Sequence, residues 1–121
     1  MRVDKMVKAT VDALEDIKGH DIVVLDVRRM TALFDKLIIA SGDSTRQNKA
    51  LANHVQEKLK ALGAAVYGVE GADSGEWILV DLGAVVVHIM QPAIRQYYNL
   101  EELWGKAAVS PRRRVVGAAR S

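Results

Sequence analysis

Asp81 and His88 lie inside a strongly apolar stretch of this 121-residue chain, residues 76–92 (EWILVDLGAVVVHIMQP). Asp81 separates two apolar runs, and His88 lies near the end of the second run. A carboxylate and an imidazole that reach one substrate form an acid–base pair of the kind many enzymes use. A lone histidine at the edge of an apolar strand is also typical of a packed or partner-contacting side chain. The stretch therefore raises two hypotheses, an active site and a contact surface.

A second candidate for chemistry is the turn at residues 41–44 (SGDS), between a predicted strand and a predicted helix. Backbone N–H groups and the helix dipole at such a turn favour a bound phosphate. The turn lacks the lysine and the spacing of a P-loop, and it also lacks a G-x-G-x-x-G motif. The pattern favours a capped helix after a tight turn, with phosphate binding as the alternative.

Metal and hydrolase chemistry have no residues to support them. The chain contains no cysteine, and its three histidines, His20, His54 and His88, do not show a metal-ligand spacing such as H-E-x-x-H. No serine stands in a G-x-S-x-G context. The sequence therefore predicts no catalytic residue, no metal site and no cofactor.

The predicted elements indicate one α/β domain. Apolar residues recur at helical spacing over residues 3–17, and again over a helix that Ser44 caps and that runs to about Leu62, with Gln47 completing a capping box. Short β-branched runs predict strands at residues 22–27, 37–40 and 65–68, followed by a hairpin within residues 76–92 and short helical turns up to Trp104. The order of helix, two strands, helix and three strands favours a mixed five-stranded sheet with flanking helices.

A strand, a Gly-Ser turn and a helix also open the nucleotidyltransferase fold. Such enzymes hold metal ions on closely spaced carboxylates, usually Asp-x-Asp on a following strand. Here that strand offers Asp81 alone, flanked by Val80 and Leu82. The sequence therefore predicts a nucleotidyltransferase-like scaffold that lacks the catalytic carboxylate pair, and no small-molecule substrate.

The charge is divided between the body of the chain and its end. Up to Trp104 there are twelve basic and fifteen acidic side chains, a net charge of −3, whereas residues 105–121 carry five basic and no acidic ones. An acidic body is a poor match for a phosphate backbone, so we expect any nucleic-acid contact at the basic, flexible tail. The charged N-terminus is unlike a signal peptide, and no apolar run approaches about 18 residues, so we expect a cytoplasmic protein without a membrane segment.

Pairing the strands of the hairpin separates its side chains into two faces. With the turn at residues 81–84 and Gly83 at positive φ, Trp77 would lie opposite His88. One face is purely aliphatic, and its members are Ile78, Val80, Val85 and Val87. The other face holds Trp77, Leu79, Val86 and His88, with Met90 and Asp81 at its ends. We expect this second face to be an exposed protein-binding patch that would also allow a homodimer, unless one helix or residues 97–104 fold over it.

Three segments, in order and at family-like spacing, resemble the ribosomal silencing factor, or Iojap, family. They are residues 37–51 (LIIASGDSTRQNKAL), residues 70–92 (EGADSGEWILVDLGAVVVHIMQP) and residues 95–104 (RQYYNLEELW). The resemblance covers about residues 3–104, so residues 1–104 are expected to form the family domain and residues 105–121 a tail. Lys36 and Leu37 depart from the family pattern, in which an aromatic residue often follows Asp35, and Met90 stands where phenylalanine is common.

This resemblance implies a regulator of translation and not an enzyme. Members bind the large ribosomal subunit through large-subunit ribosomal protein fourteen, block joining of the small subunit, and repress translation when nutrients are limited. Matching by motif, the implied contact residues are Trp77, Ile78, Leu79, Asp81, His88, Met90, Tyr97 and Tyr98, with an acidic rim of Glu70, Asp73 and Glu76. The basic tail could touch ribosomal RNA. The alternative is a catalytically active or nucleotide-binding member of the nucleotidyltransferase fold.

Overall fold

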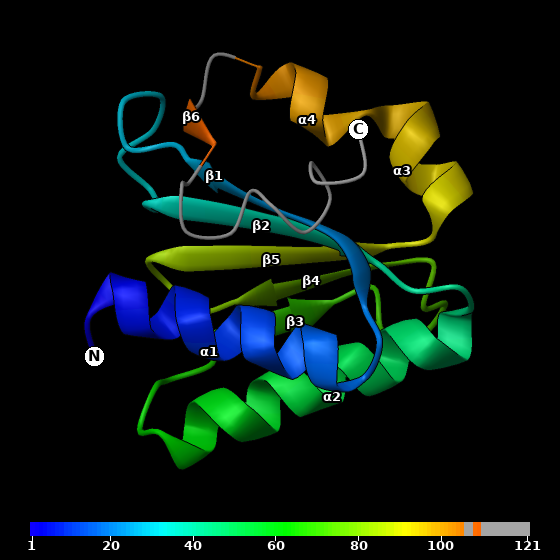
Figure 1. The fold of residues 1–121 in the computed structure, drawn as a ribbon, viewed down its shortest axis with the longest axis horizontal. Helices are drawn as coiled ribbons and strands as arrows, with labels where there is room; N and C mark the ends of the chain where they lie inside the picture. Colours follow the sequence, from blue (N-terminus) through cyan, green and yellow to red (C-terminus); the bar gives the residue numbers. More distant parts are fainter. Residues whose placement is uncertain (106–107, 110–121) are drawn as a thin grey trace.

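The structure, a computed structural model, describes residues 1–105 and 108–109. Its elements follow the chain in the order shown in Figure 1. They are α1 (Val3–Asp16), β1 (His20–Asp26), β2 (Lys36–Ser41), α2 (Thr45–Ala61), β3 (Gly68–Glu70), β4 (Trp77–Asp81), β5 (Val85–Met90), α3 (Pro92–Tyr98), α4 (Leu100–Leu103) and β6 (Ala108–Val109).

The strands form one mixed sheet in the order β3-β4-β5-β2-β1-β6. The central pair β2–β5 is parallel and the other pairs are antiparallel. The predicted single α/β domain with a mixed sheet is thus confirmed, and the short β6 adds a sixth strand to the five predicted ones. The two-residue strand β6 lies in the segment predicted as a tail, and residues 106–107 and 110–121 of that segment lie outside the described part of the chain.

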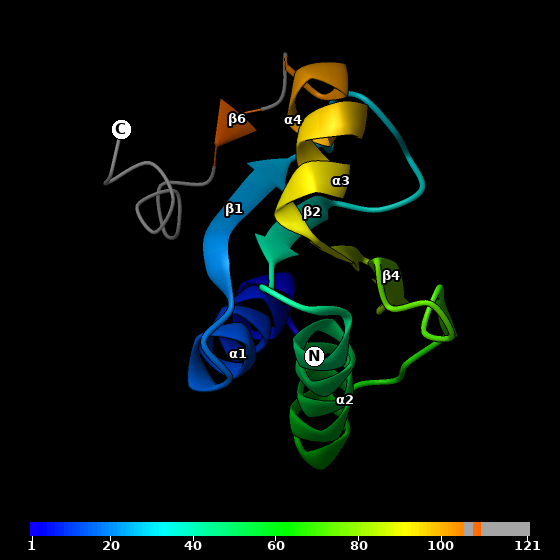
Figure 2. The same ribbon diagram turned by 90° about the vertical axis from the view of Figure 1, so that its right-hand side faces the viewer.

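Helices cover both faces of the sheet. Figure 2 shows α1 and α2 on one side and the short helices α3 and α4 on the other. The apolar stripes of α1 and α2 pack on alternate residues of the strands, because successive strand side chains point to opposite faces. This larger cluster includes Leu14, Ile38, Leu51, Ile78 and Val87. A smaller cluster on the opposite face holds Leu25, Leu37, Ile39, Val86 and Met90, with Ile94, Leu100 and Trp104 from α3–α4 packed against it.

The α2 N-terminus is capped as predicted, with one difference. The Ser44 hydroxyl accepts a hydrogen bond from the Gln47 N–H at 3.0 Å. The Gln47 side chain, however, accepts from the N–H of Asp43 at 2.7 Å, and donates to the carbonyl oxygens of Ile17 and Lys18. The Gln47 side chain therefore connects α2 to the α1–β1 turn. In a capping box it would instead have accepted a hydrogen bond from the Ser44 N–H.

We predict that Ser44→Ala lowers the free energy of unfolding by about 1 kcal/mol, because the Gln47 N–H loses its acceptor. Urea unfolding of the full chain measures the change. Arg46→Ala, an exposed substitution in the same helical turn, is the control and should change stability by less than about 0.5 kcal/mol. Equal effects of the two substitutions would contradict a role for the cap.

Two expectations about the strands were wrong in position. The third strand is Gly68–Glu70 and not residues 65–68, because its pairing with β4 begins only at Gly68 opposite Asp81. Alanine, valine and tyrosine made the preceding residues resemble a strand, yet Val66 packs against the cluster under α1 and α2 instead.

The hairpin register also differs from the prediction, by two residues. The turn closes between Leu82 and Val85, whose N–H and carbonyl oxygen are 2.9 Å apart, so Trp77 lies opposite Met90 and not His88. Burial of the Leu82 side chain explains the difference, since the pairing continues past Asp81 before the chain turns. Gly83 has the predicted positive φ, 86°. A shift of two keeps every side chain on its predicted face.

Candidate protein-binding surface

Four aromatic side chains from the hairpin and α3 meet at one edge of the small cluster. Trp77 lies diagonally across from His88 on the β4–β5 pair, and its Nε1–H donates to His88 Nδ1 at 2.8 Å. The Trp77 ring contacts Tyr98 with a centroid distance of 4.9 Å, and Tyr97 meets Tyr98 edge-on at 5.0 Å. We call Trp77, His88, Tyr97 and Tyr98 the aromatic cluster.

The outer part of the aromatic cluster is open to solvent. Tyr97 is 82% exposed and Tyr98 54% exposed, while Trp77 and His88 are partly buried. Aromatic side chains bury large areas at modest conformational cost, which is why they are enriched at protein interfaces. The arrangement offers a partly preformed platform for another macromolecule.

The predicted patch is partly covered. Ile94, Leu100 and Trp104 of the α3–α4 segment pack against the end of the face that holds Met90, and Phe34 meets Trp104 edge-on at 5.9 Å. Met90 is fully buried there, and Ile78 is fully buried on the opposite face, under the long helices. Neither side chain reaches the surface, so their predicted partner contact stays a prediction that this structure does not support.

Asp81 and His88 each have a different partner. One carboxylate oxygen of Asp81 accepts from the N–H of Gly83 at 2.8 Å, which closes the hairpin turn. His88 accepts from Trp77 through Nδ1. The remaining predicted contact residue of the hairpin, Leu79, is partly buried beside Trp77 in the small cluster. Asp81 and His88 thus each have a structural hydrogen bond, and the two side chains do not form an acid–base pair with each other.

Burial lowers the pKa of His88 to about 4, from an ordinary value near 6.5. The ring is therefore neutral at physiological pH. Because Nδ1 accepts the Trp77 hydrogen bond, the ring proton is on Nε2. Protonation in the folded state would place a cation in a largely apolar environment and remove that acceptor.

We predict that stability falls as the pH is lowered from about 6.5 to about 4. In this range the unfolded chain binds a proton at His88 and the folded chain does not, so the free energy of unfolding rises with pH. Urea unfolding across the range should show a smaller pH dependence for His88→Asn, whose amide oxygen can still accept from Trp77. The other two histidines, His20 and His54, are present in both proteins, so the comparison isolates the contribution of His88. Identical pH dependence in both proteins would contradict the prediction.

The predicted acidic residues lie at the end of β3 and on the loop that leads from it into Trp77. Glu70, Asp73 and Glu76 are all exposed. The loop is anchored by the buried Asn48, whose amide Nδ2 donates to the carbonyl oxygen of Gly75 at 2.8 Å. The acidic rim is thus a fixed feature beside the aromatic cluster.

Gly71 is the second constraint on this acidic loop. It has φ of 84°, and a Cβ there would overlap the carbonyl oxygen of Trp77. Its own carbonyl oxygen accepts from the N–H of Gly75 at 3.0 Å. The loop backbone therefore touches the first residue of β4, and glycine is required for that close approach.

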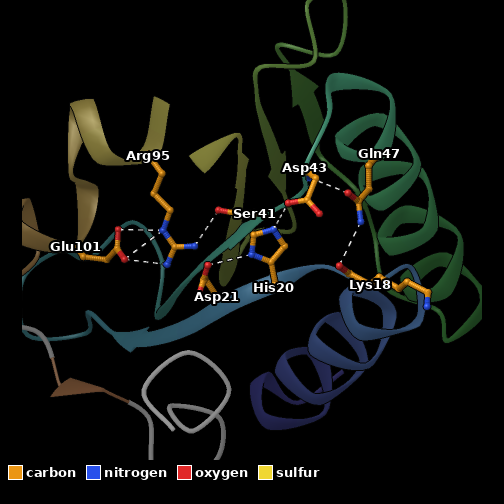
Figure 3. A network of polar contacts seen from close by, with 8 residues as sticks. All are labelled: Lys18, His20, Asp21, Ser41, Asp43, Gln47, Arg95 and Glu101. Carbon is orange, nitrogen blue, oxygen red and sulfur yellow. Dashed lines mark hydrogen bonds and ion pairs between the residues drawn. The ribbon is translucent and has the colours of Figure 1, made fainter. Parts of the chain in front are cut away.

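The turn at residues 41–44 uses its donors internally. Gln47 occupies the N–H of Asp43, as described above. The Asp43 carboxylate, which would repel a phosphate, lies 2.7 Å from His20 Nε2, and His20 Nδ1 lies 2.9 Å from Asp21 (Figure 3). These contacts favour the structural interpretation of the turn over phosphate binding. No cluster of three potential metal ligands occurs within the described residues.

Sequence reasoning missed Arg95 and its two partners. This side chain is 9% exposed, donates to both carboxylate oxygens of Glu101 at 2.8–3.3 Å, and donates to Ser41 Oγ at 3.1 Å (Figure 3). Arg95 and Glu101 both lie in the segment RQYYNLEELW, but they are six positions apart. Neither helical nor strand spacing predicts contact at that separation, and Ser41 is on a distant strand.

The departures from the family pattern have clear places in the fold. Lys36 lies 3.5 Å from the Asp26 carboxylate, and a hydrogen bond from Arg28 holds the pKa of that carboxyl well below its usual range. Leu37 is buried in the small cluster.

In the described residues no helix is long and apolar enough to cross a membrane.

Comparisons with known proteins find similar sequences and a similar fold. A model of the family described as "Ribosomal silencing factor during starvation" matches residues 1–120. The chain is 56% identical over 105 residues to a ribosomal silencing factor of Chromobacterium violaceum, covering 87% of this chain and 86% of the relative. It is 38% identical over 98 residues to the chloroplastic protein Iojap of Zea mays, covering 78% of this chain and 41% of that protein. A crystal structure of a Chromobacterium violaceum protein, 56% identical, superimposes with a TM-score of 0.85 and covers 87% of this chain and 88% of the other.

Proposed function

The chain belongs to the ribosomal silencing factor family, and from this we propose that it binds the large ribosomal subunit and keeps the small subunit from joining. Ribosome-related regulation of translation is the function common to the family. The finer proposal is that the contact is made to large-subunit ribosomal protein fourteen, in the bacterial cytoplasm and when nutrients are scarce. The family description, which names starvation, supports that last point.

The aromatic cluster beside the acidic loop is the observation that carries this proposal. A partly exposed tryptophan in tilted ring contact with a tyrosine has the composition of an interface hot spot. Glu70 ends β3, and Asp73 and Glu76 lie on the loop that follows it into β4, so the surface combines an aromatic centre with a negative rim. Proteins that bind ribosomal RNA are basic, and an acidic rim is complementary to such a partner.

The proposed mechanism is steric occlusion. A folded domain bound at the subunit interface occupies volume that the small subunit needs, so no bond is made or broken and no cofactor is required. This agrees with the roles of Asp81 and His88, which close a turn and accept from an indole. It also agrees with the internally satisfied turn at residues 41–44.

Co-sedimentation tests the binding step. The full chain is centrifuged at physiological salt with purified large subunits, with small subunits, and with naked ribosomal RNA. We expect it to pellet with large subunits only. A second copy of the chain would compete with the ribosome for the same aromatic surface. The sedimentation of the chain without ribosomal subunits is therefore measured at the same concentration, to detect self-association. Binding to naked RNA without binding to intact large subunits would refute the proposal.

A gradient assay tests the blocking step separately. Large subunits are incubated with the chain before small subunits are added, and the joined particles are separated on sucrose gradients. We expect fewer joined particles as the concentration of the chain rises, and no effect when the chain is added with an excess of isolated ribosomal protein fourteen. Binding without a decrease in joined particles would refute steric occlusion while leaving the ribosomal contact in place.

A further inference from the structure

A buried guanidinium group connects three parts of the chain at one end of the sheet. Arg95 is the one charged side chain that is buried within residues 1–105. Its side chain extends from α3 and donates hydrogen bonds to Glu101 of α4 through Nε and Nη2. The third nitrogen, Nη1, donates to the hydroxyl of Ser41 at the end of β2 (Figure 3). A guanidinium group bound on two sides fixes direction as well as distance.

The α3–α4 segment, which contains Arg95, consists of two helices too short to be stable on their own. Helix α3 has seven residues and α4 has four, and helices of this length are marginal in isolation. Asn99 joins them in a left-handed conformation with φ of 49°, and its N–H donates to the Arg95 carbonyl oxygen at 2.8 Å. Arg95 thus closes the α3–α4 junction with its backbone and again with its side chain.

Tyr98 directly precedes this junction, and its ring lies 4.9 Å from that of Trp77. We propose that Arg95 is a positioning residue: by binding Glu101 and Ser41 it fixes the α3–α4 junction on the end of β2, and so holds Tyr98 against Trp77. This inference rests on the proposed function, because it assigns Arg95 to the assembly of the partner-binding surface.

Stability alone is a weak reason for this arrangement. The electrostatic attraction within a buried ion pair is about as large as the free-energy cost of desolvating the two groups. Proteins in which apolar residues replace such a pair are therefore often as stable. Their best-supported effect is to select one arrangement of the surrounding elements. Here the arrangement selected is the angle at which Tyr97 and Tyr98 face solvent beside Trp77.

Glu101→Gln is the primary test, with Glu102→Gln as the matched control. Both substitutions remove one negative charge from α4 and preserve side-chain shape, but only Glu101 binds Arg95. The readout is the nuclear Overhauser effect between the Trp77 and Tyr98 rings in the full chain. We expect a weaker effect in Glu101→Gln and an unchanged effect in Glu102→Gln, with the same far-ultraviolet circular dichroism in both.

Binding provides the second readout. Affinity for large subunits should fall roughly tenfold in Glu101→Gln and also in Arg95→Lys, which keeps the charge but cannot bind two partners in one plane. Glu102→Gln should bind like the parent chain. The thermal midpoint is measured in parallel, because a role limited to stability would lower the midpoint while leaving the affinity and the ring contact of the folded molecules unchanged.

The outcomes separate this inference from the proposed function. If Glu101→Gln and Arg95→Lys retain either the Trp77–Tyr98 contact or full affinity, the positioning role is overturned. If the parent chain does not bind large subunits, the proposed function fails, and the ring contact alone then decides whether Arg95 positions Tyr98. Loss of both readouts in these two variants, with neither lost in Glu102→Gln, establishes the inference.

Discussion

Trp77→Ala should abolish co-sedimentation with large ribosomal subunits, with a loss of affinity of about 30-fold or more. The indole is the centre of the aromatic cluster: it donates to His88, contacts Tyr98, and follows the acidic loop directly. Truncation removes the indole ring that Tyr98 packs against and leaves His88 Nδ1 without its donor. Co-sedimentation over a range of large-subunit concentrations measures the affinity.

Two further variants make this result specific. Trp77→Phe keeps an aromatic ring against Tyr98 but loses the indole N–H, so we expect binding between that of the parent chain and that of Trp77→Ala. Leu62→Ala removes a partly exposed apolar side chain after the C-terminus of α2, away from the aromatic cluster, and should bind normally. Normal binding by Trp77→Ala in a folded protein would refute the assignment of this surface.

Gly71→Ala should lower the free energy of unfolding by roughly 3 kcal/mol or more, a large effect for one methyl group. Two costs combine at this position. The backbone has φ of 84°, which disfavours any residue with a Cβ, and that Cβ would overlap the carbonyl oxygen of Trp77. Because the overlap is with backbone, the loop must move away from β4, and the acidic rim moves with it.

Three glycines in the chain allow the two costs to be separated by urea unfolding. Gly68 has neither a positive φ nor a neighbour within 4 Å of an added Cβ, so Gly68→Ala should be nearly neutral. Gly63 has φ of 92° with open space around it, so Gly63→Ala should cost about 1–2 kcal/mol. If Gly71→Ala were no more destabilising than Gly63→Ala, the close approach of the loop to Trp77 would have no energetic importance.

Much of the fold follows from periodicity in the sequence. The apolar stripes of α1 and α2 predicted the correct helices, and the alternation along β4 and β5 predicted the correct faces. Both predictions succeed because a buried face requires apolar residues at the period of its helix or strand. The hairpin register was wrong because two alignments of the same glycine turn leave every side chain on the same face. Only the burial of Leu82 separates them, and burial depends on residues elsewhere in the chain.

The candidate site was predictable from alternation as far as the hairpin face that Trp77 and His88 share. Its apolar face and the neighbouring acidic residues can be recognised from alternation along one strand. The covering of Met90 comes from the packing of α3 and α4 on the sheet, and the contacts of Arg95 with Glu101 and Ser41 join parts of the chain that no local pattern links. A contact between residues far apart in the sequence leaves no local pattern, so the position of α3 and α4 could not be derived from the sequence.

The parallel pairing of β2 with β5 has a consequence for how the chain folds as it is synthesised. Lys36 pairs with Val85, so the central strand β2 must wait for a partner that is translated roughly fifty residues later. At 5–20 residues per second, that delay is roughly 2 to 10 seconds. During this interval β2 can pair only with β1, and one of its apolar edges is unprotected against other strands. The nascent chain is therefore most vulnerable to misassociation before its hairpin leaves the ribosome.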